Sequence, residues 1–508
     1  MSTQGYDVAV VGAGMGGLAT ACLLAKAGRS VILVDRAPVA GGVCQSLATD
    51  GLRFDIGATL LPGFGPGGPL ATLCQRLDIS LSTKECDPAF QVALPQHRIS
   101  LWATPAAWWR EIRREFPDEE AGWRALWSEL EDLSAERERA LREVPPLPPE
   151  GWGNRLRVWR VVTMGPASPA TTHPGGMLKR SMATSFRVTM VRHGLGQASQ
   201  RVLEAGLGYL LLRDADECST LEAAVALQRV RQGVVAVAGG MAAVVEALVG
   251  RFQQDGGQLR LETPVARILV DGHRVAGVVT EGGETIRARW VVANVPPDVL
   301  TGTLLPPRRG WFRRRRAVDG PWHPAQVAQA MLLAVPEALL PSELSGHCFV
   351  VGDPQRPARE ENLIFLRTAP AWDQGQAPGG IRCLTVGRFV VRRPGCEDDA
   401  MASDLLEAVD QIVPGVASAM VFHRLLTPAA LAEAWGRPSA AVRYSVETRD
   451  WLGERGLPHR LGWPGLFAVG EWTYPGRLIC NVAEGAIRVA DQISESAQSL
   501  TGIINDIL

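Results

Sequence analysis

The sequence lacks the features of a nucleic-acid-binding or membrane-spanning protein. Its 508 residues carry a formal net charge of −1, so it has no basic field to set against nucleic-acid phosphates. No stretch reaches the roughly 18 apolar residues that a spanning helix needs. Residues 1–7 lack the basic and apolar regions of a secretory signal. The sequence therefore predicts a cytoplasmic protein with no nucleic-acid partner, and any membrane contact would be peripheral.

Metal-binding and acid–base motifs are also absent from the sequence. The nine cysteines form no CxxC pair and no Cys/His cluster, which excludes a recognisable zinc site or disulfide framework and favours a reducing compartment. The eight histidines are isolated from one another, and single histidines are more typical of structural than of catalytic positions. We therefore predict no metal and nominate no catalytic side chain from the sequence.

A dinucleotide-binding fingerprint is present near the N-terminus. Residues 6–35 predict a strand, a turn, a helix and a second strand. Gly12, Gly14 and Gly17 form GxGxxG in the turn, where glycine permits a tight bend, close approach of a pyrophosphate to the backbone, and close helix packing. Asp35 follows at the distance expected of an acid that binds an unmodified adenosine ribose. This fingerprint is shared by FAD and NAD sites.

The segment from Asp35 to Gly63, DRAPVAGGVCQSLATDGLRFDIGATLLPG, resembles the second glycine motif of the amine-oxidase-like flavoproteins. Within that superfamily it is most similar to the phytoene-desaturase and carotenoid-isomerase family. The resemblance implies FAD as cofactor. It places diphosphate contacts at the paired glycines and a flavin-facing segment about twenty residues later, and Val43 stands where the family often has Arg. The implied binding residues of this segment are Asp35, Arg36, Gly41, Gly42, Gly57, Ala58 and Thr59.

Two later segments extend the resemblance. The stretch AGGMAAVVEALVGRFQQDGGQLRLETPVARIL predicts a helix and strands, and the family resemblance implies that the backbone of Val265 contacts adenine. The stretch LFAVGEWTYPGRLICNVAEGAIRVADQ resembles the C-terminal flavin motif. There Gly470 and Glu471 are expected near the ribityl chain or diphosphate, and Val482 and Ala483 at the start of a helix that faces the flavin.

The layout predicts an α/β fold, with a discontinuous Rossmann-type FAD-binding domain and an inserted, mixed α+β substrate domain. The length alone exceeds what one core usually supports. We expect the FAD-binding domain to comprise residues 1–85, 231–305 and 459–508, and the substrate domain to comprise 86–230 and 306–458. The substrate segments match the family in layout only, so the sequence does not specify the substrate.

The resemblance implies an FAD-dependent oxidoreductase that desaturates a carotenoid or related apolar polyene. A carotenoid cis-trans isomerase that uses reduced FAD is an alternative, as is an amine oxidase, a protoporphyrinogen-oxidase-like or a hydroxysqualene-processing enzyme. A non-catalytic FAD-binding lipid escort is the alternative outside enzymes. The run Arg313 to Arg316, flanked by aromatic residues, suits an anionic membrane surface, although a solvated loop would have the same composition.

Overall fold

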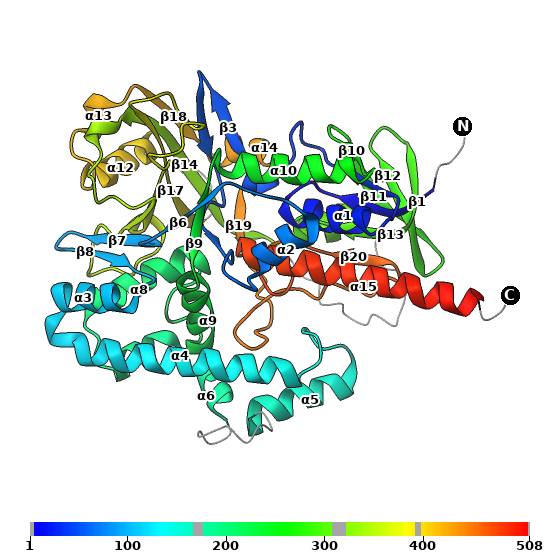
Figure 1. Ribbon diagram of the computed structural model, residues 1–508, viewed down its shortest axis with the longest axis horizontal. Coiled ribbons are helices and arrows are strands. Elements are labelled where there is room, and N and C mark those ends of the chain that lie inside the picture. Colours follow the sequence, from blue (N-terminus) through cyan, green and yellow to red (C-terminus); the bar gives the residue numbers. More distant parts are fainter. Residues whose placement is uncertain (1–4, 166–175, 307–321, 392–397, 506–508) are drawn as a thin grey trace.

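Two large β-sheets organise the chain (Figure 1). The computed structural model describes residues 5–165, 176–306, 322–391 and 398–505. Strands of the first sheet come from the beginning, middle and end of the sequence, and strands of the second come from two separate stretches between them. The chain therefore passes back and forth between the sheets.

The first sheet has seven strands in the order β10-β2-β1-β13-β12-β11, with β20 also paired to β13. The strands β10, β2, β1, β13 and β20 are parallel to their neighbours, whereas β11 and β12 form an antiparallel meander with β13. Parallel strands end at the same edge of a sheet, so the loops that follow β1, β2, β13 and β20 are brought together. The strand bounds are β1 Tyr6–Val11, β2 Val31–Val34, β10 Gln258–Arg260, β11 Val265–Asp271, β12 Arg274–Thr280, β13 Thr285–Ala293 and β20 Leu466–Ala468.

Both faces of the central strand β1 are buried, as its continuous apolar sequence predicts. Val8 and Val10 pack into a core that includes residues of helices on one face, and Ala9 and Val11 pack into a second core on the other. Gly28 follows the first of these helices in the left-handed conformation, with φ +78°, which is typical of a glycine that ends a helix. The helices of the first face are α1 Met15–Lys26, α2 Pro69–Leu77, α10 Gly240–Gln254 and α15 Ile479–Asn505.

The second sheet has eight strands in the order β18-β14-β17-β16-β15-β7-β8, with β19 also paired to β14. It is antiparallel except where β7 runs parallel to β15. That pairing joins a strand near residue 90 to strands that follow residue 320, so the two stretches form one structure. The bounds are β7 Phe90–Leu94, β8 His97–Leu101, β14 Pro324–Pro336, β15 His347–Val350, β16 Ile364–Thr368, β17 Ile381–Val391, β18 Phe422–Leu426 and β19 Ala441–Tyr444.

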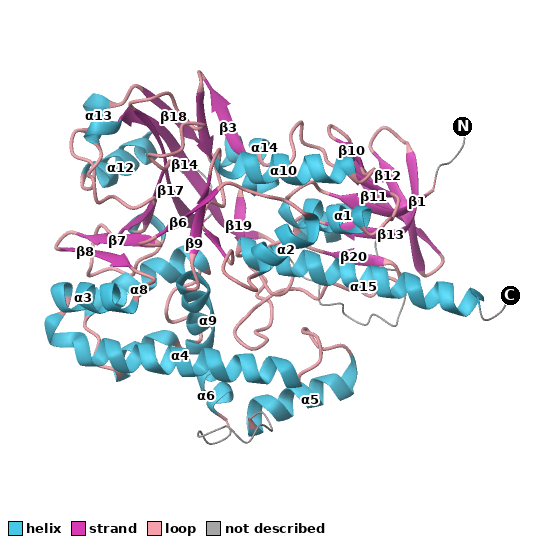
Figure 2. Ribbon diagram, viewed as in Figure 1, coloured by secondary structure: helices cyan, strands magenta, loops and turns pink. Residues whose placement is uncertain are grey.

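A group of helices lies along one side of the molecule, where Figure 2 shows α3, α4, α5, α6 and α9 together. Their core contains the fully buried indoles of Trp108 and Trp123, with Trp127 packed 4.9 Å from Trp108 between ring centroids. Ser219 and Glu222 form a capping box that fixes the start of α9. The bounds are α3 Pro105–Glu115, α4 Glu120–Glu143, α5 Gly151–Met164, α6 Met177–Ala183, α7 Phe186–Arg192, α8 Gln197–Leu210 and α9 Thr220–Arg231.

Two small sheets, four further α-helices and five short 3-10 or π-helical segments complete the described fold. The hairpin of β3 and β4 and the three-stranded sheet β5-β9-β6 lie between the large sheets in sequence and space. This arrangement confirms the expected α/β class with a Rossmann-type unit and a mixed α+β part, while the exact residue limits of the two domains stay predictions. The remaining bounds are β3 Ser46–Thr49, β4 Leu52–Asp55, β5 Leu61–Pro62, β6 Thr83–Cys86, β9 Val234–Val237, α11 Pro297–Val299, α12 Asp398–Asp410, α13 Val416–Ala419 and α14 Pro428–Ala434.

Candidate active site

The glycine turn between β1 and α1 leaves no room for side chains. Gly12 has a φ of +101°, and a Cβ there would lie 2.3 Å from the backbone oxygen of Asn294. A Cβ on Gly17 would lie 2.0 Å from the backbone oxygen of Gly12. Gly14, by contrast, faces the end of the Asn294 side chain, at 2.8 Å from its Nδ2. Gly12 and Gly17 are therefore required by packing, and Gly14 keeps the start of α1 open to a ligand.

Asp35 follows β2 directly and holds the glycine turn in place. Its carboxylate accepts hydrogen bonds from the backbone N–H of Ala13, at 2.5 Å, and of Ala37, at 2.8 Å. Burial raises the pKa of Asp35, and these backbone N–H groups partly offset that effect. Each carboxylate oxygen has a second lone pair, so both can still accept a hydroxyl donor such as that of a ribose.

A first cavity, with about 910 Å³ of empty space, opens beside Asp35. Gly12, Gly14 and Gly42 line it from the glycine loops, and Val265 lines it from the start of β11. Arg36 also borders this cavity. The residues expected at the adenosine and diphosphate end of a dinucleotide are thus gathered around one space.

The second glycine motif lies along a neighbouring cavity. Gly41 has a φ of +117°, and its backbone N–H donates to the oxygen of Ala13 at 2.8 Å, which ties this motif to the first. A Cβ on Gly57 would lie 1.9 Å from the backbone oxygen of Val43, so only glycine fits beneath that turn. The close packing directs Ala58 and Thr59 along the cavity.

This second cavity has about 1120 Å³ of empty space and shares Gly14, Asn294, Trp435 and Arg437 with the first. The shared lining makes the two spaces continuous, so one extended ligand could run from Asp35 past the glycine loops to Thr59. Gly41, Gly57, Ala58, Thr59, Gly470, Glu471 and Val482 line the second cavity. The open glycine cradle and the joined cavities fit FAD.

Two of the sequence-predicted residues line neither cavity. Gly17 acts through its packing against Gly12. Ala483 is fully buried in the core beneath the first sheet, because α15 begins at Ile479, three residues before the start expected from the sequence. The helix begins soon after the turn at Pro475 and Gly476, so Val482 lies in its first turn and Ala483 faces inward.

Several residues of the site carried no signal of their own in the sequence analysis. Asn294 follows β13, and its side chain donates to the backbone oxygen of Gly12 at 3.2 Å. A residue that directly follows a buried parallel strand lies at the ligand-binding edge of the sheet. The place of Asn294 after β13 could therefore have been predicted from the sequence. Trp435 and Arg437 lie in the loop after α14, and no local pattern marks that loop.

Arg437 and Glu471 form an ion pair, with 2.5 Å between Nη2 and Oε1. Arg437 lines both cavities, whereas Glu471 lines the second. A guanidinium at the junction of the two spaces, beside the glycine loops, could bind a diphosphate by charge-assisted hydrogen bonds. It also offsets the charge of Glu471, which would otherwise repel that group.

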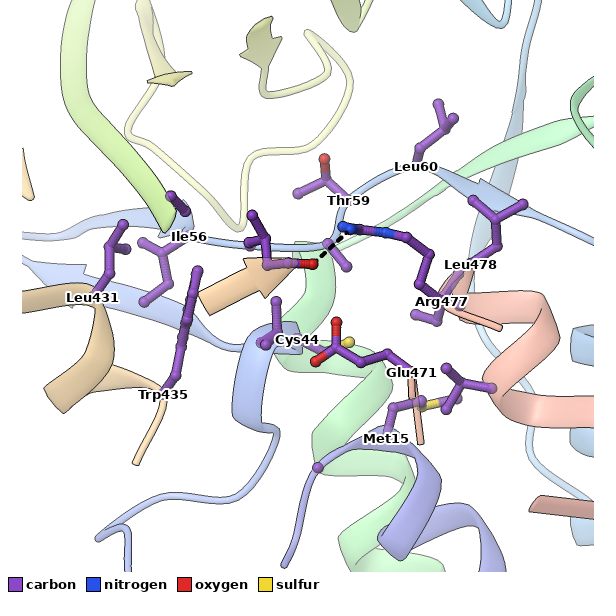
Figure 3. Close-up of a pocket in the computed structure, with 18 of the residues that line it drawn as sticks. Met15, Cys44, Ile56, Thr59, Leu60, Leu431, Trp435, Glu471, Arg477 and Leu478 are labelled. Atoms are coloured by element: carbon purple, nitrogen blue, oxygen red, sulfur yellow. Dashed lines mark hydrogen bonds between the residues drawn. The ribbon is translucent and has the colours of Figure 1, made fainter. Parts of the chain in front are cut away.

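The part of the second cavity away from the glycine loops is lined mainly by apolar and aromatic side chains, with Arg477, Gln329 and Thr385 as its polar members. Figure 3 shows Leu431 and Trp435 on one side of this space and Arg477 and Leu478 on the other. The rings of Tyr209 and Phe365, 5.4 Å apart between centroids, border the same space, and Phe365 packs 4.9 Å from Phe389. The remaining apolar lining comes from Ile56, Leu60, Leu210, Ala328, Ala330 and Val442.

Arg477 is a second cation in this cavity. Its Nη1 donates to the backbone oxygen of Val442 at 3.1 Å, the contact drawn in Figure 3. Within the described residues Arg477 forms no salt bridge, and desolvation lowers its pKa. Arg437 is paired with Glu471, so Arg477 is the charge of this cavity that is not balanced by a salt bridge within the described residues. The space is therefore unfavourable for a cationic substrate.

Thr59 connects the cavity to a buried histidine. Its Oγ1 lies 3.0 Å from Nε2 of His347 and 3.5 Å from the hydroxyl of Tyr209. Burial lowers the pKa of His347 to about 3, so the imidazole is neutral at ordinary pH. His347 therefore orients Thr59 as an uncharged hydrogen-bond partner and adds no charge to the site.

The described residues contain no group of three or more His, Cys, Asp or Glu side chains arranged to hold a metal. The run Arg313 to Arg316 lies outside the residues that the structure describes. Its suggested contact with a membrane surface therefore stays a prediction.

Comparison with known proteins agrees with the FAD site described above. Residues 15–494 match the family model of flavin-containing amine oxidoreductases. A neurosporene-forming phytoene desaturase of Cereibacter sphaeroides is 24% identical, over 92% of this chain and 90% of the relative. A chloroplastic prolycopene isomerase of Arabidopsis thaliana is 22% identical, over 96% of this chain and 82% of the relative.

The fold is also found among solved structures. An oxidoreductase from Methanosarcina mazei superimposes with a TM-score of 0.63 at 19% identity, over 95% of this chain and 99% of that protein. FAD, the cofactor implied by the second glycine motif, fits the joined cavities described above. The chain belongs to the flavin-containing amine oxidoreductase family and is an FAD-dependent oxidoreductase.

Proposed function

We propose that this oxidoreductase desaturates a long apolar polyene of the carotenoid class. The observation that carries the proposal is the apolar and aromatic lining next to Thr59, where Leu431, Phe365 and Phe389 border the part of the cavity away from the glycine loops. Relatives named as phytoene desaturases and prolycopene isomerases cover nearly the whole chain. Both names denote enzymes that act on long hydrocarbon chains.

The glycine loops around Gly14 and Gly41 would hold the diphosphate of FAD, with Arg437 as its cation. Asp35 would accept the hydroxyls of the adenosine ribose, and Thr59 and Val482 would border the flavin end. Bound FAD supplies the two-electron redox chemistry of such a reaction. The protein contributes a binding space that excludes water and holds the reacting carbons close to the cofactor.

The side chains around the cavity position the substrate and provide no evident acid or base. Ala328, Ala330 and Leu431 present only hydrocarbon to the space. Glu471 is held in its ion pair with Arg437, and His347 stays neutral behind Thr59. A substrate that is a pure hydrocarbon would meet this lining without leaving a polar group of its own unpaired.

The same features argue against a protonated amine as substrate. Arg437 is paired with Glu471, but Arg477 borders the same cavity and forms no salt bridge within the described residues. A cationic amine would be repelled by the excess positive charge. We therefore expect putrescine and benzylamine to leave the flavin oxidised under anaerobic conditions.

Isomerisation of a polyene is the second candidate, because prolycopene isomerases match 96% of the chain. The apolar lining suits either reaction. Val43 also stands where the resembling family often has an arginine, and the isomerase and terminal-desaturase branches more often lack that arginine. The two reactions differ in the hydrogen balance between substrate and product.

Product mass and flavin reduction test the proposal together. The purified holoprotein is mixed anaerobically with phytoene, zeta-carotene or prolycopene in detergent micelles. Desaturation should bleach the oxidised flavin and yield a product lighter by two hydrogens for each step. A product of unchanged mass, formed only with reduced flavin, would establish the isomerase. If no polyene is converted or bleaches the flavin, the polyene assignment is wrong.

A further inference from the structure

Helix α5, Gly151–Met164, has apolar side chains on two opposite faces. Val158 and Val161 are buried against the rest of the helical group. Trp152, Leu156 and Trp159 are spaced four and three residues apart, so they share one face of the helix. Their exposed fractions are 87%, 63% and 57%. This face, which we call the α5 stripe, is directed away from the protein core.

Exposure of two indoles on one helix face is unusual, because tryptophan is among the most highly buried side chains on average. The α5 stripe is also set at the edge of the molecule, where Figure 1 shows α5 as the outermost helix of its group. No other described element packs on the stripe, since Gly151 to Arg157 are all exposed. The stripe is therefore free to meet an extended surface.

The charges of α5 indicate the nature of that surface. Arg155 and Arg160 flank the stripe on its two sides, and Arg157 lies further round the helix. The helix sequence GWGNRLRVWRVVTM contains no acidic residue, and no salt bridge joins these arginines to any other residue in the described parts of the chain. The surface of α5 thus combines apolar side chains with uncompensated positive charge.

We propose that α5 is a lipid-binding helix that lies in the interface of an anionic membrane with the α5 stripe toward the acyl chains. Tryptophan favours the interfacial region because its ring is apolar and its N–H can remain hydrogen-bonded. Arginines beside an apolar stripe at the same depth bind lipid phosphates. A protein partner would have to supply several carboxylates around an apolar patch of only three residues. An anionic membrane supplies both the negative charge and the apolar phase, so it fits the α5 stripe better.

The binding is peripheral. None of the helices in the described ranges combines the length and the apolar character needed to cross a bilayer. The α5 stripe is separate from the cofactor cavities, none of whose lining residues lies on α5. The lipid assay below uses no substrate, so its outcome is independent of the reaction proposed above.

Sedimentation of the holoprotein with vesicles tests the proposal. Vesicles of phosphatidylcholine containing 30% phosphatidylglycerol, chosen to imitate an anionic membrane at about physiological surface potential, are compared with vesicles of phosphatidylcholine alone. The wild-type protein should bind the anionic vesicles at least about tenfold more strongly, and added salt should weaken that binding. Equal binding to both vesicles, or none to either, would overturn the proposal.

Two pairs of variants separate the apolar and the charged contributions. Trp152→Ser/Trp159→Ser should abolish sedimentation, whereas Trp372→Ser, which removes a tryptophan that is 37% exposed in the turn between β16 and β17, should not. Arg155→Gln/Arg160→Gln should lower the partition coefficient about 30-fold, which corresponds to about 1 kcal/mol for each arginine. Arg110→Gln/Arg113→Gln removes two exposed arginines of α3 and should leave binding unchanged. Flavin content and circular dichroism confirm that each variant is folded.

A self-association test examines whether a second copy of the chain, and not a membrane, binds the α5 stripe. Light scattering after size exclusion gives the mass of the wild type and of Trp152→Ser/Trp159→Ser without lipid. A wild-type dimer that becomes a monomer in the variant would identify the α5 stripe as a contact between two copies and would overturn the membrane assignment. Equal masses, together with loss of vesicle binding, support it.

Discussion

Arg437 and Glu471 face each other across the point where the two cofactor cavities join, with 2.5 Å between the guanidinium and the carboxylate. The relatives that this sequence resembles often place an arginine after the paired glycines, where this chain has Val43. Arg437 comes from a loop nearly four hundred residues later, yet it lines the same cavity as Gly41 and Val43. We infer that it provides the positive charge that Val43 cannot.

Replacement of Arg437 by alanine should weaken FAD binding by about tenfold to a hundredfold, the range expected from losing one charge-assisted hydrogen bond. Riboflavin has no diphosphate, so its affinity should change little. Titration of the apoprotein with each ligand, followed by flavin fluorescence, measures both. An equal loss of affinity for FAD and riboflavin would show that Arg437 only supports the fold.

A double variant sharpens that test. With Arg437 removed, Glu471 would be left as an unpaired carboxylate near the diphosphate. Glu471→Gln should therefore recover part of the FAD affinity in the Arg437→Ala background. Arg437→Lys keeps the charge and should lose less affinity than Arg437→Ala. Failure of both substitutions to recover FAD binding would contradict a charge-based role.

Gly14 and Gly17 should respond differently to alanine. At Gly17 the added Cβ would lie 2.0 Å from a backbone oxygen, so Gly17→Ala should destabilise the apoprotein, by about 1 to 3 kcal/mol as for other overpacked sites. At Gly14 the nearest atom is the amide nitrogen of a side chain that can rotate. Gly14→Ala, and more strongly Gly14→Val, should leave a folded protein that retains little FAD.

Thermal unfolding of the apoproteins and flavin content after reconstitution check this contrast. If Gly14→Val retains the wild-type flavin content, the glycine turn is not the diphosphate site. If Gly17→Ala unfolds at the wild-type temperature, the close packing of Gly17 on Gly12 has little energetic weight.

Arg477 should raise the reduction potential of the bound flavin. A cation in a poorly solvated cavity stabilises the extra negative charge of a reduced cofactor. Arg477→Met, which retains much of the side-chain volume, should therefore lower the midpoint potential by about 30 mV or more, equal to about 1.4 kcal/mol for a two-electron couple. Equilibration with a reference dye measures the shift, and Arg443→Met, in the neighbouring cavity, provides a control that should leave it unchanged. An unchanged potential in Arg477→Met would place the guanidinium away from the flavin.

Mild acid should destabilise the fold through two buried histidines. Burial lowers the pKa of His347 to about 3 and that of His459 to about 4, whereas an unfolded histidine titrates near 6.5. Between these values the unfolded chain binds protons that the folded chain does not. Each histidine thus lowers the free energy of unfolding by up to about 1.4 kcal/mol per pH unit as pH falls below about 6.5.

Urea unfolding at pH 7 and pH 5 measures this dependence. In the wild type, the backbone oxygen of Ala468 accepts a hydrogen bond from Nδ1 of His459 at 2.9 Å. His459→Gln keeps a side-chain donor for this oxygen but removes the titrating imidazole. The variant should therefore lose less free energy of unfolding than the wild type between pH 7 and pH 5. An acid sensitivity in His459→Gln equal to that of the wild type would assign the effect to other groups.

The sequence was most informative where a short motif determines backbone geometry. The GxGxxG turn, Asp35 and the Gly41–Thr59 segment could be placed because each lies next to a strand or turn with a local signature. Arg437, Trp435 and Arg477 could not, because each reaches the cavity from an irregular loop whose position depends on the packing of distant strands. The expected start of α15 was late for a similar reason, since the turn at Pro475 and Gly476 that sets it has no fixed length.

Asn294 fills the space that side chains would need at Gly12, Gly14 and Gly470. The N-terminal turn, the strand β13 and the C-terminal motif consequently pack around one residue, although their residues emerge from the ribosome at widely separated times. A nascent chain that ends before residue 466 lacks β20 and Gly470, so it would carry the glycine turn without the loop that closes the site beside it. Cofactor loading is then expected to be a late event, which follows completion of synthesis and the slow pairing of distant strands.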